Sequence, residues 1–211
     1  MALVELNNIT KSYGKKNILN EFSLEIQEGE FIAIMGASGR GKSTILNILG
    51  LLETFDHGKL IIDGETNIAP NSSKATRLLR EKISYLFQNF ALVDDETVEY
   101  NLDLALKYVK NKKQEKHIKM QEALSIVGLE NYEKRKIYEL SGGEQQRVSV
   151  ARIILKPSKI ILADEPTGSL DEENRDLILN LLKKLNSQGK TIVIVTHDKY
   201  VADRCQRIIN L

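Results

Sequence analysis

The fold is decided by the stretch Phe31-Ile32-Ala33-Ile34-Met35-Gly36-Ala37-Ser38-Gly39-Arg40-Gly41-Lys42-Ser43-Thr44. Its first five residues form a continuous apolar run, which is typical of a strand covered on both faces. The next eight match the pattern G-x-x-x-x-G-K-[ST], and apolar residues at positions 45, 46, 48 and 49 predict a helix after it. A strand, this pattern and a helix in that order predict a phosphate-binding loop.

Each residue type in this loop suits phosphate chemistry. Glycines let the backbone curl so that several N–H groups face one phosphate, and the helix N-terminus adds a partial positive charge. We expect Lys42 to reach the β- and γ-phosphates of a nucleotide and the Ser43 hydroxyl to bind Mg²⁺. The alternative is a glycine-rich turn without a ligand, but the four fixed positions would coincide less than about once in a hundred such chains. The sequence therefore predicts nucleotide binding.

A second apolar run ends in two carboxylates. Residues 159–165 read Lys-Ile-Ile-Leu-Ala-Asp-Glu, which predicts a buried strand with Asp164 at its carboxyl end. Open α/β sheets bind ligands at that edge, so Asp164 could hold Mg²⁺ directly or through water. The adjacent Glu165 is suited to accept a proton from an attacking water. An isolated Asp-Glu pair is more often a solvated turn, and the phosphate loop in the same chain favours the functional interpretation.

The other apolar runs predict further strands. Runs 3–9 and 18–26 alternate apolar and polar residues around a turn at Tyr13-Gly14, which is typical of an antiparallel pair. Run 191–196 is continuous and rich in Ile and Val, as in a parallel sheet covered by helices. These runs predict an α/β phosphate-loop NTPase core with a mixed, mainly parallel sheet and an N-terminal antiparallel β subdomain.

Helical patterns complete the organisation. Apolar residues at helical spacing over 120–127 precede Gly128 as a C-terminal cap, and a wider stripe over 177–185 has Asp171 as N-cap. Section 97–139 is helical in pattern without a clear strand, so we expect a helical insert carried by the core. The expected domain is single, residues 1–211, with the core at about 1–88 and 140–211 and the insert at about 89–139.

Composition narrows the class of protein. The 211 residues carry 30 Lys and Arg against 29 Asp and Glu, a net charge of +1. This balance argues against nucleic acid as a partner held by bulk charge, and a local basic patch is the alternative. A single cysteine, Cys205, excludes an internal disulfide framework. We expect no signal peptide, because no apolar core follows a basic flank at the start. No apolar run approaches the ~20 residues that span a bilayer, so we expect no membrane crossing by this chain alone.

The most specific stretch is Leu140-Ser141-Gly142-Gly143-Glu144-Gln145-Gln146-Arg147. It resembles the signature sequence of ATP-binding cassette (ABC) ATPases, and further motifs stand in that family's order. Tyr13 is placed like the aromatic residue that stacks on adenine, and Gln88 like the glutamine that joins the core to the helical insert. Ser169-Leu170-Asp171 resembles the loop that crosses the dimer interface. His197 is similar to the switch histidine.

The resemblance implies a mechanism in which two cassettes sandwich two ATP molecules head to tail, with Mg²⁺ as the second cofactor. Hydrolysis would be an in-line attack by water. The implied catalytic residues are Glu165 as base, His197 at the γ-phosphate, Lys42 and Gln88. The implied metal ligands are Ser43, Gln88 and Asp164. The implied nucleotide contacts within one chain are Tyr13, Gly36, Ala37, Ser38, Gly39, Arg40, Gly41, Lys42, Ser43 and Thr44. The implied contacts in trans are Ser141, Gly142, Gly143, Glu144, Gln145 and Asp171.

Within this family the sequence favours the ATPase subunit of a transporter that drives export by a separate transmembrane permease at the cytoplasmic face of the cell membrane. Only 52 residues separate Gln88 from Ser141, which leaves no room for the long coiled coil of chromosome or repair ATPases. Stretches such as residues 163–171 resemble the cassettes of macrolide export and lipoprotein release. Residues 87–93 look closest to the bacteriocin-export group.

The alternatives are a regulatory ATP-binding module that tethers a membrane protein with little turnover, and a nucleotide kinase, which would leave the signature unexplained.

Three features depart from the family pattern or stand outside it. Arg40 occupies a phosphate-loop position where a small residue is more usual, and we expect its side chain to point to solvent. The family usually continues beyond Leu211 into another strand, so we expect a short variant or a trimmed end. Six lysines between Lys107 and Lys119 stand against one acid, Glu115. We interpret them as a solvated helical face, and contact with anionic lipid headgroups is the alternative.

Overall fold

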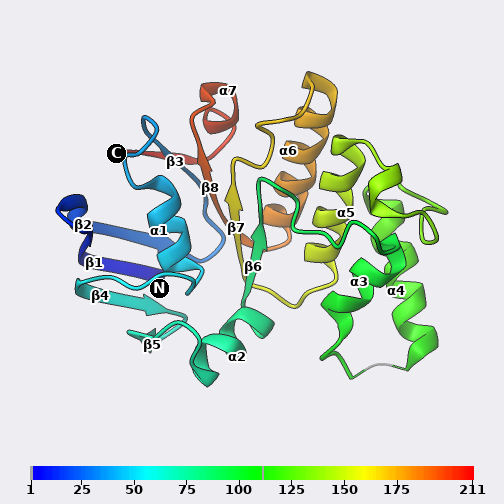
Figure 1. Cartoon of the computed structure of the whole chain (residues 1–211), viewed down its shortest axis with the longest axis horizontal. Helices are drawn as coiled ribbons and strands as arrows, with labels where there is room; N and C mark the ends of the chain where they lie inside the picture. The colour runs from blue at the N-terminus through cyan, green and yellow to red at the C-terminus, as the bar shows by residue number, and fades with distance from the viewer. Residues whose placement is uncertain (1, 111) are drawn as a thin grey trace.

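The computed structural model describes residues 2–110 and 112–211, and a parallel sheet stands at its centre (Figure 1). Five strands lie in the order β6-β7-β8-β3-β9, and every neighbouring pair is parallel. Their bounds are β3 Phe31–Met35, β6 Ile83–Leu86, β7 Ile160–Asp164, β8 Thr191–Thr196 and β9 Arg207–Asn210. The strands predicted at 31–35, 160–163 and 191–196 are confirmed, and their apolar runs are buried on both faces.

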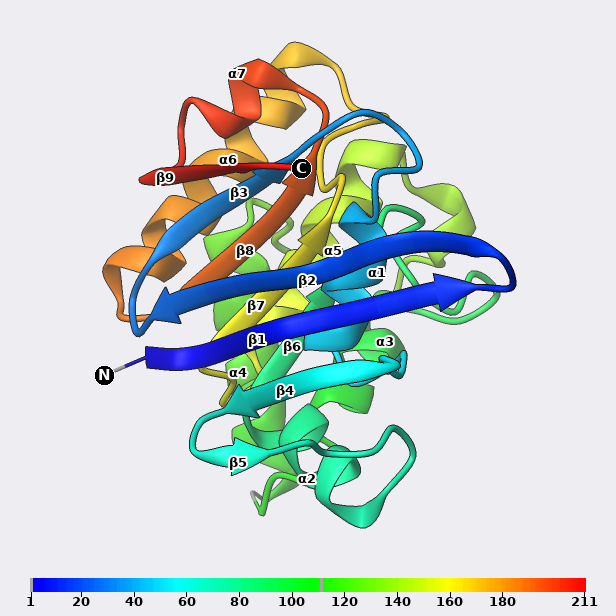
Figure 2. The same ribbon diagram turned by 90° about the vertical axis from the view of Figure 1, so that its left-hand side faces the viewer.

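The antiparallel strands form a second, separate sheet. Figure 2 shows β2, β1, β4 and β5 side by side in that order. Their bounds are β1 Ala2–Tyr13, β2 Lys16–Gln27, β4 His57–Ile62 and β5 Glu65–Thr66. The predicted β1–β2 pair is confirmed, although β1 runs through Tyr13, which pairs with Lys16, so that the turn is Gly14-Lys15. Apolar side chains of this sheet, the parallel sheet and helix α1 (Lys42–Leu49) share one buried cluster.

Helices cover the other face of the parallel sheet, on the right in Figure 1. Helices α5 (Gly142–Ile154) and α6 (Glu172–Ser187) join β7 and β8 in a second buried cluster, to which the helices of the 97–139 section contribute. The remaining bounds are α2 Ser73–Glu81, α3 Val98–Leu106, α4 Lys113–Ile126, the 3-10 helix η1 Ile137–Glu139 and α7 Lys199–Ala202. Within the described parts of the chain, no helix has the length and apolar character needed to cross a membrane.

The predicted helix ends are confirmed by their hydrogen bonds. Gly128 follows α4 with φ +68° and donates its N–H to the Ser125 carbonyl at 3.1 Å. Asp171 caps α6 by accepting the Asn174 N–H at 2.8 Å. These caps satisfy backbone groups that a helix end otherwise leaves without partners. The described residues between 97 and 139 form α3, α4 and η1 as expected, and an isolated bridge pairs Thr97 with Lys136.

The contact between β1 and β4 gives a test of the antiparallel sheet. A Cβ on Gly58 would lie 2.6 Å from the Asn8 carbonyl oxygen, and its φ is +111°. We expect Gly58→Ala to destabilise the protein by more than the about 1–2 kcal/mol of left-handed backbone strain alone, because β1 must also shift. Gly64→Ala is the control, since Gly64 has φ +79° with no atom within 4 Å of its Cβ position. Equal unfolding free energies for both variants in urea would contradict the close approach.

Candidate nucleotide site

A polar cavity of about 300 Å³ lies at the carboxyl ends of the parallel strands. Its lining residues are Lys16, Ile18, Ser38, Gly39, Gly41, Lys42, Ser43, Thr44, Gln88, Asp164, Glu165 and Val195. Strands β3 and β7 both pair with β8, so the loop after β3 and the acidic end of β7 reach the same edge. This is the edge at which open α/β sheets bind ligands.

The phosphate loop is folded around its own lysine. Gly41 begins α1 with a left-handed φ of +95°, and no side chain caps the first turn of this helix. Lys42 is 9% exposed, and its Nζ donates to the carbonyl of Gly36 at 2.7 Å and of Ala37 at 3.2 Å. Phosphate oxygens are stronger acceptors than peptide carbonyls. The loop therefore offers a helix N-terminus and a preplaced ammonium group to an anion.

The residues beside the loop fit a magnesium ion. Asp164 ends β7, and its carboxylate is hydrogen-bonded by the Ser43 side chain. Burial, with a smaller contribution from the neighbouring Glu165 charge, raises the pKa of Asp164, although Ser43 and Lys42 oppose this. Gln88, whose side chain carries an amide oxygen, lines the same cavity. Carboxylate, hydroxyl and amide oxygens are the ligands that Mg²⁺ takes beside phosphate and water. The described residues contain no group of three or more His, Cys, Asp or Glu side chains that could hold a metal ion.

Glu165 is held at the cavity wall by the end of β8. Its backbone is left-handed, with φ +43°, a strained conformation of the kind that clusters at functional sites. One carboxylate oxygen accepts the Thr196 hydroxyl at 3.0 Å. The other accepts the His197 N–H at 3.0 Å and lies 2.7 Å from Nδ1 of the His197 ring. A carboxylate oriented in this way beside a phosphate loop can accept a proton from water.

The signature residues do not line this cavity. Ser141 caps α5, where its hydroxyl accepts the Glu144 N–H at 3.3 Å and its own N–H donates to the Glu144 carboxylate at 2.8 Å. At Gly143 a Cβ would lie 2.5 Å from Asn174 of α6, and the Asn174 amide donates to the Asp171 carboxylate at 2.8 Å. The starts of α5 and α6 therefore form one packed unit, the signature unit. The residues of this unit that are predicted to contact a partner's nucleotide do not line the cavity of their own chain: Ser141, Gly142, Gly143, Glu144, Gln145 and Asp171.

The predicted adenine contact, Tyr13, also lies outside the lining. The residue is 47% exposed, its hydroxyl donates to Glu53 at 3.1 Å, and Lys11 Nζ lies 4.9 Å from the ring centre. Arg40 is exposed and does not line the cavity, as expected from its place in the loop. Stacking of Tyr13 on a base stays a prediction.

Residues 19–168 match the family described as ABC transporter, which is more than half of the chain. The chain belongs to the ABC transporter family. The family predicted from residues 140–147 is therefore confirmed.

Relatives and solved structures agree with this assignment. The macrolide export ATP-binding/permease protein MacB of Campylobacter jejuni is 41% identical over 209 residues, 99% of this chain and 33% of the relative. The chain thus spans about a third of the length of the curated relatives it matches. The dimeric structure of the bacterial ABC transporter cassette MJ0796 is 41% identical, with a TM-score of 0.90 over 99% of this chain and 94% of that one. A post-hydrolysis state of MJ0796 bound to ADP and Pi is 42% identical, with the same TM-score of 0.90 and the same coverage of 99% and 94%.

Several residues that shape the site were not predicted from the sequence. Lys16 and Ile18 come from β2 of the other sheet, and nothing in their local sequence indicates this position. Thr196, which holds Glu165, could have been found, because it is the polar end of a continuous apolar strand directly before His197.

The half-buried Asp164 gives a test of the site. Its pKa is raised in the folded chain, so the unfolding free energy falls as the pH rises through the unfolded and then the folded pKa. We expect Asp164→Asn to raise the melting temperature at pH 7.5 in EDTA, with the gain shrinking towards pH 4. The same variant should lose the stabilisation that Mg-ATP gives the wild type. The control is Asp95→Asn, an exposed carboxylate, which should stay within about 0.5 kcal/mol. A less stable Asp164→Asn variant in EDTA would contradict the burial argument.

Proposed function

We propose that the chain binds and hydrolyses Mg-ATP and that it drives export by a separate transmembrane permease. The observation that carries this proposal is the cavity that joins the phosphate loop, Asp164 and Glu165 at one edge of the sheet. The 41% identity to a dimeric cassette over 94% of that structure supports it. The relative bound to ADP and Pi is named as a post-hydrolysis state, which supports turnover as well as binding.

In the proposed reaction each residue has a physical task. Lys42 would exchange the carbonyls of Gly36 and Ala37 for phosphate oxygens. Glu165 would orient water and accept its proton while the water oxygen bonds to the γ-phosphorus, and the bond to the β–γ bridging oxygen breaks to release ADP. His197 would fix the Glu165 carboxylate and contact the γ-phosphate. Ser43, Asp164 and Gln88 would hold Mg²⁺, which supplies charge neutralisation at the β- and γ-phosphates.

The site is completed by a second copy of the chain. The signature unit lies outside its own chain's cavity, and α5 begins there with a capped N-terminus whose partial positive charge suits a phosphate. A head-to-tail dimer would place this N-terminus against the partner's ATP. Closing of the dimer on ATP and its opening after hydrolysis would then be the mechanical output.

The names of the relatives, which join an ATP-binding part to an export permease, support the proposal of export. The cytoplasmic face of the cell membrane is the location that we propose for the chain. The regulatory module with little turnover is the alternative, and the complete set of Lys42, Asp164, Glu165 and His197 favours turnover. Bacteriocin as the exported cargo stays a prediction.

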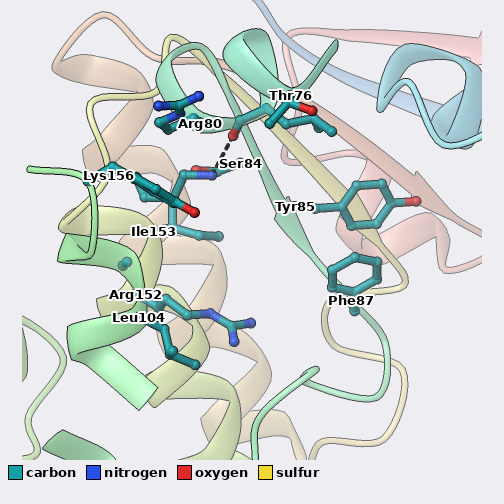
Figure 3. A pocket seen from close by; sticks show the side chains of 12 residues that line it. Thr76, Arg80, Ser84, Tyr85, Phe87, Leu104, Arg152, Ile153 and Lys156 are labelled. Carbon is teal, nitrogen blue, oxygen red and sulfur yellow. Dashed lines mark hydrogen bonds between the residues drawn. The ribbon is translucent and has the colours of Figure 1, made fainter. Parts of the chain in front are cut away.

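A groove of about 380 Å³ is the surface that we propose for contact with the permease (Figure 3). Tyr85 and Phe87 stack with ring centres 4.1 Å apart on one wall, opposite Leu104 and Arg152. Phe87 lines this groove, whereas the next residue, Gln88, lines the nucleotide cavity. Among the described residues that line the groove, the charged ones are all cationic, namely Arg80, Arg152 and Lys156. We infer that it receives an amphipathic permease helix that carries a carboxylate.

The first test separates hydrolysis from binding. We expect Glu165→Gln to bind ATP, to lose at least about 10²-fold in phosphate release because the proton acceptor is gone, and to accumulate an ATP-bound dimer on gel filtration. Lys42→Ala is the contrasting variant, which should lose ATP binding and therefore the dimer. Wild-type turnover by Glu165→Gln would remove Glu165 from the role of base.

The second test concerns the groove. We expect Leu104→Asp to abolish co-purification of a multi-spanning membrane protein from detergent-solubilised membranes, because it places a carboxylate in the apolar wall. Ile118→Asp is the matched control in the same helical section, since Ile118 is 48% exposed against 40% for Leu104 and lies outside the groove. Equal retention by both variants would exclude the groove. Absence of any membrane partner, with ATPase activity intact, would exclude the transporter role.

A further inference from the structure

The turn after Gln88 has an unusual backbone that helix α5 holds from outside. Phe90 and Ala91 are consecutive and left-handed, with φ +62° and +48°, although neither is glycine. The Arg152 guanidinium donates to the carbonyl of Ala91 at 2.6 Å and of Phe90 at 3.0 Å. The Ser149 hydroxyl donates to the Phe90 carbonyl at 2.9 Å. Since such a backbone is disfavoured on its own, these bonds select its conformation.

Among the described residues, the guanidinium of Arg152 donates hydrogen bonds to the carbonyls of Phe90 and Ala91. No ion pair among the described residues includes Arg152, and burial lowers its pKa. A partly buried guanidinium still needs acceptors, and hydrogen bonds from a charged donor are stronger than neutral ones. The two carbonyls therefore fix Arg152, and Arg152 fixes the turn.

The same turn also touches the start of α5. The Phe90 ring lies 3.8 Å from the Cβ position of Gly142, in the signature. Helix α5 thus contacts the turn at Gly142 and again at Ser149 and Arg152, on a single rigid element. Gln88 stands two residues before Phe90 and lines the nucleotide cavity. The position of Gln88 is therefore tied to the helix that begins with the signature.

We infer that Arg152 is a positioning residue, which holds Gln88 at the metal position of the nucleotide cavity through the carbonyls of Phe90 and Ala91. The inference rests on the proposed function, because it takes Gln88 as a ligand of Mg²⁺. Arg152 also lines the groove, so in the proposed function the same side chain would link the permease surface to the metal position.

The test measures metal affinity and backbone exchange in addition to turnover. Mn²⁺ is titrated, with detection by electron paramagnetic resonance, into protein saturated with a non-hydrolysable ATP analogue. We expect Gln88→Ala and Arg152→Gln each to weaken Mn²⁺ binding about three- to tenfold, and the double variant to be no weaker than Gln88→Ala. Arg152→Lys, which keeps one donor, should restore part of the affinity. In ligand-free protein, hydrogen–deuterium exchange across residues 86–94 should rise in Arg152→Gln and not in Gln88→Ala.

Two further variants complete the design. Arg207→Gln is the control, because Arg207 also donates to a backbone carbonyl, that of Glu25, but lies away from the cavity, so Mn²⁺ affinity should not change. Ser149→Ala removes only one bond to the turn and should give a smaller loss in the same direction, which keeps the test valid if Arg152→Gln does not fold.

The opposing outcomes are distinct. A loss of affinity in Gln88→Ala without one in Arg152→Gln and Ser149→Ala, or additive losses in the double variant, would overturn the positioning role and leave the proposed function standing. Unchanged Mn²⁺ affinity in Gln88→Ala would overturn both the role of Gln88 as ligand and this inference.

Discussion

The parallel pairing of β3, β7 and β8 is the constraint on which the molecule depends. Because all three strands run in one direction, their carboxyl ends meet at one edge, where Asp164 stands beside Val195 and Met35 beside Thr196. The segments at the ends of these strands therefore lie at one edge although they are far apart in sequence. They are the phosphate loop, the pair Asp164-Glu165 and the loop that begins at His197. Apolar runs buried on both faces hold the strands in register, so a continuous core fixes the positions of the polar groups.

The polar groups at this edge lower the free energy of unfolding. A buried ammonium at Lys42, a half-buried carboxylate at Asp164 and a left-handed backbone at Glu165 are each unfavourable by themselves. The two buried clusters on either side of the parallel sheet offset this cost. Such a balance is expected of a site that acts on a charged ligand, because groups satisfied fully by their own chain would have no affinity left for it.

The sequence predicted those parts of the fold and site that depend on local signals. A few adjacent residues specify the phosphate loop, the acidic end of β7 and the caps Gly128 and Asp171, so these features could be predicted from the sequence. Features that depend on residues distant in sequence could not be predicted. Lys16 enters the cavity from another sheet, and the bonds of Arg152 join residues about 60 positions apart. No periodicity in a single chain records such contacts.

The separation of the signature from its own chain's cavity has a genetic consequence. In the proposed head-to-tail dimer, each of two composite sites draws its phosphate loop from one copy and its signature from the other. A chain with a defective loop and a chain with a defective signature would therefore form a mixed dimer in which both defects fall into one site. The other site would be assembled wholly from intact parts. Two inactive alleles would thus complement each other, as a two-fold related pair of shared sites requires.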